Sequence, residues 1–301
     1  MKKKHLRILL PAAAAIAAAA AALNTRLTLR HYTVESDKVS QSVRLVLLTD
    51  LHACDYGEGQ RELLDMVEEQ HPDLVLLGGD ILDDDPALPE ENAWTVIEAL
   101  GRAYPTFYVT GNHEFWSGRA EEMKARIAES GVTVLEGEGQ TVVFQGQPLH
   151  ICGIDDPAVG TDVWQAQLSG AARGAAGEGF SILLTHRPER TSAYEGQGFD
   201  LILAGHAHGG QWRIPFLLNG LLAPNQGFFP AFAGGRYELG EATLIVSRGL
   251  ARESTRVPRL FNPPELVVIH AQPEAAEMPD ASPQACSRLT GKHRQNAQSQ
   301  A

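Results

Sequence analysis

The sequence predicts an α/β protein in which two packed, mixed β-sheets are flanked by helices. Short apolar runs alternate with amphipathic stretches in the first half of the chain, as they do in layered α/β domains. In the second half, apolar runs follow one another closely across Gly-containing turns, which is typical of antiparallel strands. The composition agrees, because 44% hydrophobic and 21% charged residues among 301 are ordinary globular usage. This usage excludes a collagenous, wholly disordered or polytopic membrane chain.

Three units of a buried strand followed by a helix are expected from residue 43 onward, because each apolar run precedes a stretch of helical periodicity. The strands are predicted at residues 43–49, 73–77 and 106–110. The helices are predicted at about residues 60–70, 94–100 and 119–129.

Shorter strands are expected beyond residue 130. A meander is predicted from three strands at residues 132–135, 141–144 and 149–154. Further apolar strands are predicted at residues 180–184, 201–204, 243–246 and 266–269. The Gly-rich stretch 170–179 is expected to be a surface loop rather than a linker, so the middle of the chain forms one domain of about 240 residues.

The two ends of the chain differ from the domain predicted at residues 32–272. Residues 1–31 contain six basic and no acidic residues, and residues 8–23 are uncharged and rich in Ala. As a helix this run would span about 24 Å, which predicts a short membrane anchor or a cleaved signal peptide. Either one places the domain outside the cytoplasm, tethered to the cell membrane or secreted; an Ala-rich helix packed on a soluble domain is the alternative. Residues 273–301 are expected to be a disordered tail.

The predicted domain is strongly acidic. Residues 32–270 contain 16 basic and 34 acidic residues, a net charge of −18. A basic track for nucleic acid is therefore not expected. An acidic domain that binds an anionic substrate needs a local positive charge, which bound metal ions would supply. The three Cys residues are too few for a zinc ribbon or a disulfide framework.

Candidate metal ligands follow the predicted strands directly. They are Asp50 and His52 in TDLH, Asp80 in GGD, Asn112 in GNHE, His186 in LLTH, and His206 and His208 in GHAH. Side chains at the carboxyl ends of strands line the binding crevice of an α/β sheet. A set of Asp, Asn and His without thiolate suits Mn²⁺, Zn²⁺ or Fe, and its His content excludes a Ca²⁺ cage of oxygen ligands alone.

In this order, the residues resemble the motifs of the calcineurin-like metallophosphoesterases, which are DxH, GD, GNHE, a lone His and GHxH. The resemblance covers roughly residues 44–269. The stretches GHAHGGQ and RLFNPPELVVI are also similar to a bacterial, envelope-associated branch of that superfamily. The resemblance implies a four-layer fold of helix, sheet, sheet and helix, and an enzyme that hydrolyses phosphoester bonds.

The resemblance also implies a role for each residue. Asp50, His52 and His208 would hold one divalent metal ion, Asn112, His186 and His206 would hold the other, and Asp80 would bridge the two. The two ions, Mn²⁺, Zn²⁺ or Fe²⁺/Fe³⁺, would clamp a phosphoryl group and generate the attacking hydroxide. His113, next to Asn112, would be a catalytic acid near the leaving oxygen.

Other residues near the motifs are weaker candidates. Arg187, Arg248 and Arg252 would either meet substrate oxygens or form surface ion pairs. Cys54 is expected to be a small buried residue rather than a nucleophile. The acidic run 83–85 is expected to be solvated, and recruitment of a further cation is the alternative. The apolar segment 214–235 is either a buried connection or an apolar lip for a lipid-linked phosphate.

The predicted function is metal-dependent hydrolysis of a small or lipid-linked phosphoester, whether a diester, a monoester or a lipid-linked pyrophosphate. The N-terminal segment is the predicted contact with the membrane, nucleic acid is not an expected partner, and no protein partner is indicated. The alternative is a metal-binding scaffold that keeps the fold without hydrolysis, against which the complete ligand set argues.

Overall fold

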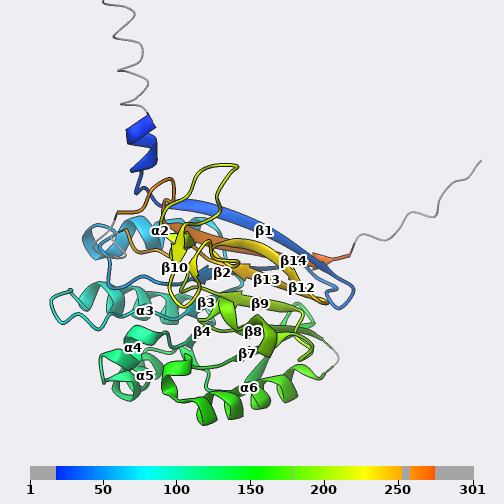
Figure 1. The fold of residues 1–301 in the computed structure, drawn as a ribbon. Helices are drawn as coiled ribbons and strands as arrows, with labels where there is room; N and C mark the ends of the chain where they lie inside the picture. Colours follow the sequence, from blue (N-terminus) through cyan, green and yellow to red (C-terminus); the bar gives the residue numbers. More distant parts are fainter. Residues whose placement is uncertain (1–17, 178, 253–257, 275–301) are drawn as a thin grey trace, which may run out of the picture.

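The computed structural model describes residues 18–177, 179–252 and 258–274. It confirms the predicted fold class, because two six-stranded sheets pack against each other and helices cover their outer faces (Figure 1). The carboxyl ends of the parallel strands in both sheets carry the motifs identified above.

The first sheet has the strand order β1-β14-β2-β3-β4-β5. Its strands are β1 (Thr28–Ser36), β2 (Val43–Leu48), β3 (Leu74–Gly78), β4 (Thr106–Val109), β5 (Thr133–Val134) and β14 (Glu265–Pro273). The strands from β2 to β5 are parallel, and β14 is antiparallel to β2. The loops after β2, β3 and β4 therefore lie at one edge of the sheet.

The second sheet has the strand order β12-β13-β9-β8-β7-β6. Its strands are β6 (Gly139–Phe144), β7 (Gln147–Gly153), β8 (Phe180–Leu184), β9 (Leu201–Ala204), β12 (Gly235–Leu239) and β13 (Ala242–Val246). The four central strands are parallel, and the two edge strands β6 and β12 are antiparallel to their neighbours. A short hairpin of β10 (Leu222–Ala223) and β11 (Gly227–Phe228) stands apart from both sheets.

The helices lie between the strands in the sequence. The α-helices are α2 (Arg61–Glu69), α3 (Glu91–Ala103), α4 (Asn112–Trp116), α5 (Ala120–Glu129), α6 (Thr161–Ala175) and α7 (Thr191–Tyr194). Single 3₁₀ turns are η1 (Glu58–Gln60), η2 (Pro157–Val159), η3 (Pro188–Arg190) and η4 (His208–Gly210).

The core has an inner layer between the sheets and an outer layer under the helices. Leu45 and Leu47 of β2 belong to the inner layer, which both sheets share. Val46 and Leu48 belong to the outer layer beneath α2 and α3. On the other side, α6 covers the second sheet through Leu168 (Figure 1). Because the strands are buried on both faces, they appear in the sequence as continuous apolar runs.

The predicted meander is wrong in one respect. β5 pairs parallel to β4 in the first sheet, whereas β6 and β7 form an antiparallel pair in the second sheet. The helix α5 lies between β4 and β5 in the sequence. A strand, helix and strand in succession form a parallel crossover, so β5 belongs to the sheet of β4.

The predicted loop at residues 170–179 is also wrong, because α6 continues through Ala175. Ala175 extends the buried face of Leu168. A Cβ atom at Gly170 would lie 2.2 Å from the carbonyl oxygen of Gly137. Glycine at this position therefore permits close packing of the helix, which the composition alone does not distinguish from a flexible loop.

The two ends of the chain lie largely outside the described residues. Residues 18–22 are helical, whereas residues 8–17 of the predicted anchor and residues 275–301 of the predicted tail are not described. The first sheet begins at Thr28, before the predicted start of the domain. Among the described residues, no helix has the length and hydropathy needed to cross a membrane.

Candidate metal centre

The predicted ligands come together because both sheets end at the same place. In the first sheet, Asp50 and His52 follow β2 and Asp80 follows β3. In the second sheet, His186 follows β8, and two further histidines, His206 and His208, follow β9. Asn112 is the first residue of α4 after β4, and the Asp80 carboxylate accepts the backbone N–H of its neighbour His113 at 2.9 Å.

Among the described residues, four groups of side chains have their ligand atoms within 4.8 Å of one another. Two of these groups include His113, with His52 and Asp80 or with Asp83 and Asp84, and the other two consist only of predicted ligands. Asp50, His52 and His208 form the first group, and Asp80, His186 and His206 form the second. The Oδ2 atom of Asp80 lies 3.0 Å from Nε2 of His186 and 3.8 Å from Nε2 of His52. Asp80 therefore belongs to the second group and also lies close to His52 of the first.

The chemistry of these side chains fits divalent metal ions. Within the described part of the chain, three of the buried side-chain atoms that lack a hydrogen-bond partner belong to candidate ligands: Asp50 Oδ2, His52 Nε2 and Asn112 Oδ1. Buried polar atoms normally have such partners, so these three are free to coordinate a cation. Burial holds the pKa of His206 and of His208 well below the usual value. Both imidazoles are therefore neutral, as metal ligation requires.

The backbone is strained where it presents the ligands. Asp50, His52, Asp80, His206 and His208 all have φ between 46° and 63°. Residues other than glycine seldom adopt this left-handed region, which costs of the order of 1 kcal/mol for each residue. Strain concentrated at one place indicates that the surrounding fold holds these side chains toward a common point.

Two glycines make room for the carboxylates. A Cβ atom at Gly111 would lie 2.1 Å from Oδ1 of Asp80, and one at Gly205 would lie 2.5 Å from Oδ2 of Asp50. Neither distance is compatible with a side chain, so the Gly in each of the GNHE and GHAH motifs is required by packing around the site.

Asp83 and Asp84 orient two imidazoles of the site. Oδ2 of Asp83 lies 2.6 Å from Nδ1 of His52, which leaves Nε2 of that ring toward Asp80. Oδ1 of Asp84 lies 2.5 Å from Nδ1 of His113. A carboxylate behind a ligating histidine fixes its tautomer and ring orientation. The prediction that the run 83–85 is solvated is therefore wrong for Asp83, which is partly buried.

The same carboxylates keep a proton on His113. Burial lowers the pKa of this imidazole, but the contact with Asp83 and the charge of Asp80 outweigh burial and raise the pKa to about 9. His113 therefore carries a proton at neutral pH, which is the state that a general acid needs.

Glu114 is a fully buried carboxylate to which the sequence analysis assigns no role. Its two oxygens accept four backbone N–H groups, from Asp80, Ile81, Leu82 and Gly111, at 2.8–3.2 Å. Burial and the charge of Asp80 raise its pKa to about 7. Glu114 therefore ties the loop after β3 to the start of α4. The sequence feature that could have identified Glu114 is an acidic residue in the first turn of a helix.

Replacing Glu114 by alanine is expected to lower the free energy of unfolding by about 3 kcal/mol or more, because four buried donors lose their acceptor. Urea denaturation followed by circular dichroism measures this change. Glu129→Ala, on the exposed surface of α5, is the matched control and should change stability by less than about 0.5 kcal/mol. Equal stability of the two variants would contradict the role of Glu114.

Arg187 is held inside the protein rather than directed at solvent. Its guanidinium forms a two-point pair with Asp156, in which NH2 lies 3.0 Å from Oδ1. Asn225 accepts from Arg187, and its Oδ1 lies 2.8 Å from Nε2 of His206. Because Asn225 belongs to the apolar segment 214–235, that segment is part of the site and not only a connection. Sequence reasoning missed this contact, since a lone Asn in a loop carries no pattern.

The other weaker candidates are engaged in local contacts. Arg248 pairs with Glu265 in the interior at 2.5 Å. Arg252 pairs with Glu62, its guanidinium carbon lies 4.2 Å from the ring centre of Tyr56, and its backbone N–H donates to Cys54 Sγ at 3.5 Å. Both arginines therefore form ion pairs within the protein, with Glu265 and Glu62.

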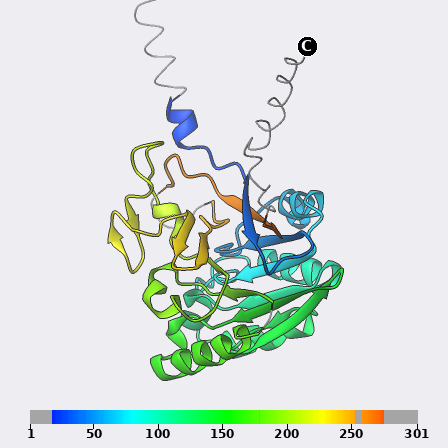
Figure 2. The ribbon, with the colours of Figure 1, turned by 90° about the vertical axis from the view of Figure 1, so that its right-hand side faces the viewer.

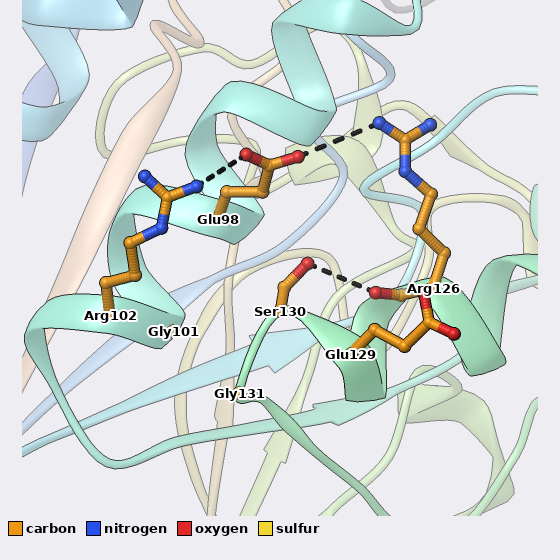
Figure 3. Close-up of a pocket in the computed structure, with 7 residues that line it drawn as sticks. All are labelled: Glu98, Gly101, Arg102, Arg126, Glu129, Ser130 and Gly131. Atoms are coloured by element: carbon orange, nitrogen blue, oxygen red, sulfur yellow. Dashed lines mark hydrogen bonds and ion pairs between the residues drawn. The ribbon is translucent and has the colours of Figure 1, made fainter.

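A separate pocket lies between α3 and α5, and Figure 3 shows the residues that line it. Glu98 of α3 lies 2.8 Å from Arg102 and 3.7 Å from Arg126. The Arg126 guanidinium also stacks 3.8 Å above the ring of Trp94. Both guanidinium groups therefore have acidic partners, and the lining includes none of the predicted metal ligands.

Comparisons with known proteins agree with the motifs. A family model described as calcineurin-like phosphoesterase matches residues 43–210. An uncharacterized metallophosphoesterase of Campylobacter jejuni, Cj0846, is 32% identical over 79% of this chain and 61% of its own length. The phosphodiesterase YaeI of Escherichia coli is 28% identical over 60% of this chain and 64% of its own. The chain thus spans less than two thirds of either relative.

Solved structures of low identity share part of the architecture. A 5′-nucleotidase precursor from Thermus thermophilus is 16% identical, with a TM-score of 0.48, over 70% of this chain and 50% of that one.

Proposed function

Because the chain belongs to the calcineurin-like phosphoesterase family, as its motifs predict, we propose that it is a hydrolase that uses two divalent metal ions to cleave phosphoester bonds. The proposal is supported by the pair of ligand groups, because Asp80 belongs to the second group and its Oδ2 also lies 3.8 Å from Nε2 of His52 in the first. One group is built on the loops of the first sheet together with His208, and the other joins Asp80 to the histidines of the second sheet.

We assign the residues that would hold the ions as the family resemblance implies. Asp50, His52 and His208 would hold one, His186, His206 and Asn112 the other, with Asp80 common to both. When bound, such ions supply positive charge for the phosphoryl oxygens and lower the pKa of a water molecule toward 7. This supply of positive charge is what the acidic domain otherwise lacks.

The chain's own contribution to the chemistry is His113. Hydrolysis forms a bond from phosphorus to a water oxygen and breaks the ester bond from phosphorus to the leaving oxygen. The leaving oxygen takes the proton of His113 Nε2, and the water releases its proton to solvent. Asp84 fixes the ring through Nδ1, and Asp83 and Asp80 keep it protonated, so the acid is in the right state before substrate binds.

The charge of the domain favours small substrates. A net charge of −18 over residues 32–270 repels a long polyanion except at the metal centre itself. We therefore propose a phosphodiester or phosphomonoester with few further negative charges, rather than nucleic acid.

Hydrolysis of a chromogenic ester tests this function. The full chain, loaded with Mn²⁺, should hydrolyse bis(p-nitrophenyl) phosphate or p-nitrophenyl phosphate. Chelation with EDTA should abolish the activity, and addition of Mn²⁺ or Zn²⁺ should restore it. A folded, metal-loaded chain that hydrolyses neither ester would favour the scaffold alternative and contradict the proposal.

A further inference from the structure

An apolar pocket opens directly beside the metal centre. It has a volume of about 520 Å³ and is lined by His208 together with Trp212, Leu222, Pro224 and Phe228. Its walls come from the segment that follows the GHAH motif and from the β10–β11 hairpin. His208 is both a candidate metal ligand and part of the pocket wall, so the pocket adjoins the metal centre at this residue.

The rim of the pocket exposes large apolar side chains to solvent. Phe216 and Leu217 have exposed fractions of 107% and 85%, the highest among the large apolar side chains of the described residues. Phe228 and Phe229 are also mostly exposed. Residues 209–235 contain no acidic residue and a single basic one, although the domain as a whole is strongly acidic. Exposed large apolar side chains gathered in one nearly uncharged segment are typical of an interaction site.

The N-terminal segment joins the domain beside this rim. The backbone carbonyl of Ala22 accepts the N–H of Phe261, and the neighbouring Leu260 pairs with Trp212 at the pocket. Figures 1 and 2 both show the yellow-green loop around residue 216 projecting on the side where the helix at residues 18–22 leaves the domain. The helix at residues 18–22, which belongs to the end of the Ala-rich run, therefore meets the domain beside this apolar segment.

We propose that the substrate is a lipid phosphoester in a bilayer, whose phosphoryl group binds at the metal centre and whose hydrocarbon chain lies in the pocket between Trp212 and Phe228. Phe216 and Leu217 contact the bilayer, and the N-terminal segment holds the domain against it. This inference rests on the proposed function and specifies its substrate. Apolar walls beside a phosphoester site gain stabilisation only from a substrate that carries an apolar group.

The first test measures dependence on chain length. The full chain in phosphatidylcholine nanodiscs is assayed with p-nitrophenyl alkyl phosphodiesters from methyl to octyl. Each methylene that enters the pocket should raise kcat/KM up to about fourfold, the factor that corresponds to about 0.8 kcal/mol per buried CH₂. The double variant Leu222→Ser/Phe228→Ser should lower the ratio of octyl to methyl kcat/KM roughly tenfold. Val163→Ser, an exposed apolar position on α6, is the matched control and should keep the wild-type ratio.

The second test does not depend on hydrolysis. An octylphosphonate with a diazirine at the end of its chain is photolysed on the full chain, and the labelled tryptic peptide is identified by mass spectrometry. Label in residues 214–236, displaced by octylphosphonate but not by methylphosphonate, is the expected result. Trypsin releases this peptide by cleavage after Arg213 and Arg236.

The outcomes separate the two proposals. Hydrolysis of the methyl diester without chain-length dependence, and label elsewhere in the chain, would overturn the lipid substrate and leave the phosphoesterase intact. Label in residues 214–236 without hydrolysis of any ester would support the pocket and overturn the phosphoesterase. A dimer that dissociates in Phe216→Ser/Leu217→Ser would show that a second copy covers the rim, and would overturn the bilayer contact.

Discussion

Replacing Asp80 by asparagine should lower kcat for bis(p-nitrophenyl) phosphate by roughly 10³-fold or more. Asparagine keeps the shape of the side chain and tolerates the φ of 51° at this position. It removes the negative charge of the carboxylate whose Oδ2 lies near both His52 and His186. The loss of positive charge held at the phosphoryl group corresponds to several kcal/mol of transition-state stabilisation. Steady-state kinetics at saturating Mn²⁺ measures the change.

The matched control is Asp65→Asn, on the exposed face of α2. This variant also removes one negative charge, but at a position that is distant in sequence from the candidate ligands. It should retain the wild-type kcat. If Asp80→Asn were folded and as active as Asp65→Asn, a bridging role for Asp80 would be ruled out.

Replacing His113 by alanine should lower kcat by about 10²- to 10⁴-fold, the range typical of a lost general acid. The metal content should stay unchanged, because none of the ligand roles proposed above falls on His113. The loss should be smaller for esters whose leaving group is already acidic, such as p-nitrophenol, and larger for alkyl leaving groups. Comparing kcat for a p-nitrophenyl and an alkyl leaving group separates proton donation from metal binding.

Asp84→Asn provides the companion measurement. The carboxylate of Asp84 contacts Nδ1 of His113 and has no place among the proposed ligands. Asp84→Asn should lower kcat by part of the factor expected for His113→Ala, and the decrease should depend on the leaving group in the same way. A His113→Ala variant with unchanged kcat for alkyl leaving groups would show that another group supplies the proton.

The positions of the candidate ligands were predictable because the pattern is local. Each ligand stands within four residues of a buried strand, and a strand buried on both faces is visible as an apolar run such as VRLVLL. Parallel strands place their carboxyl ends at one edge, so the motifs after β2, β3, β8 and β9 converge once the sheets pack. Family resemblance supplied the expected division between two ions.

The supporting contacts were not predictable because they join residues that are distant in sequence. Asn225, in the turn of the short β10–β11 hairpin, meets His206, and Arg187 meets Asp156 across the ends of two strands. Acidic runs are usually exposed to solvent. Asp83 contacts His52 because the tertiary fold brings the two residues together. The glycines of α6 led to the wrong prediction of a loop for the same reason. Gly170 packs closely against Gly137, and this contact depends on the tertiary fold.

The number of bound metal ions directly tests whether the chain holds two ions with Asp80 between them. The full chain is dialysed against Mn²⁺ and then against metal-free buffer, and the bound metal is counted by inductively coupled plasma mass spectrometry. Two ions per wild-type chain, and at most one per Asp80→Asn chain, are expected if the carboxylate of Asp80 binds both ions. A wild-type chain that retains one ion or none, or an Asp80→Asn chain that retains two, would contradict the account.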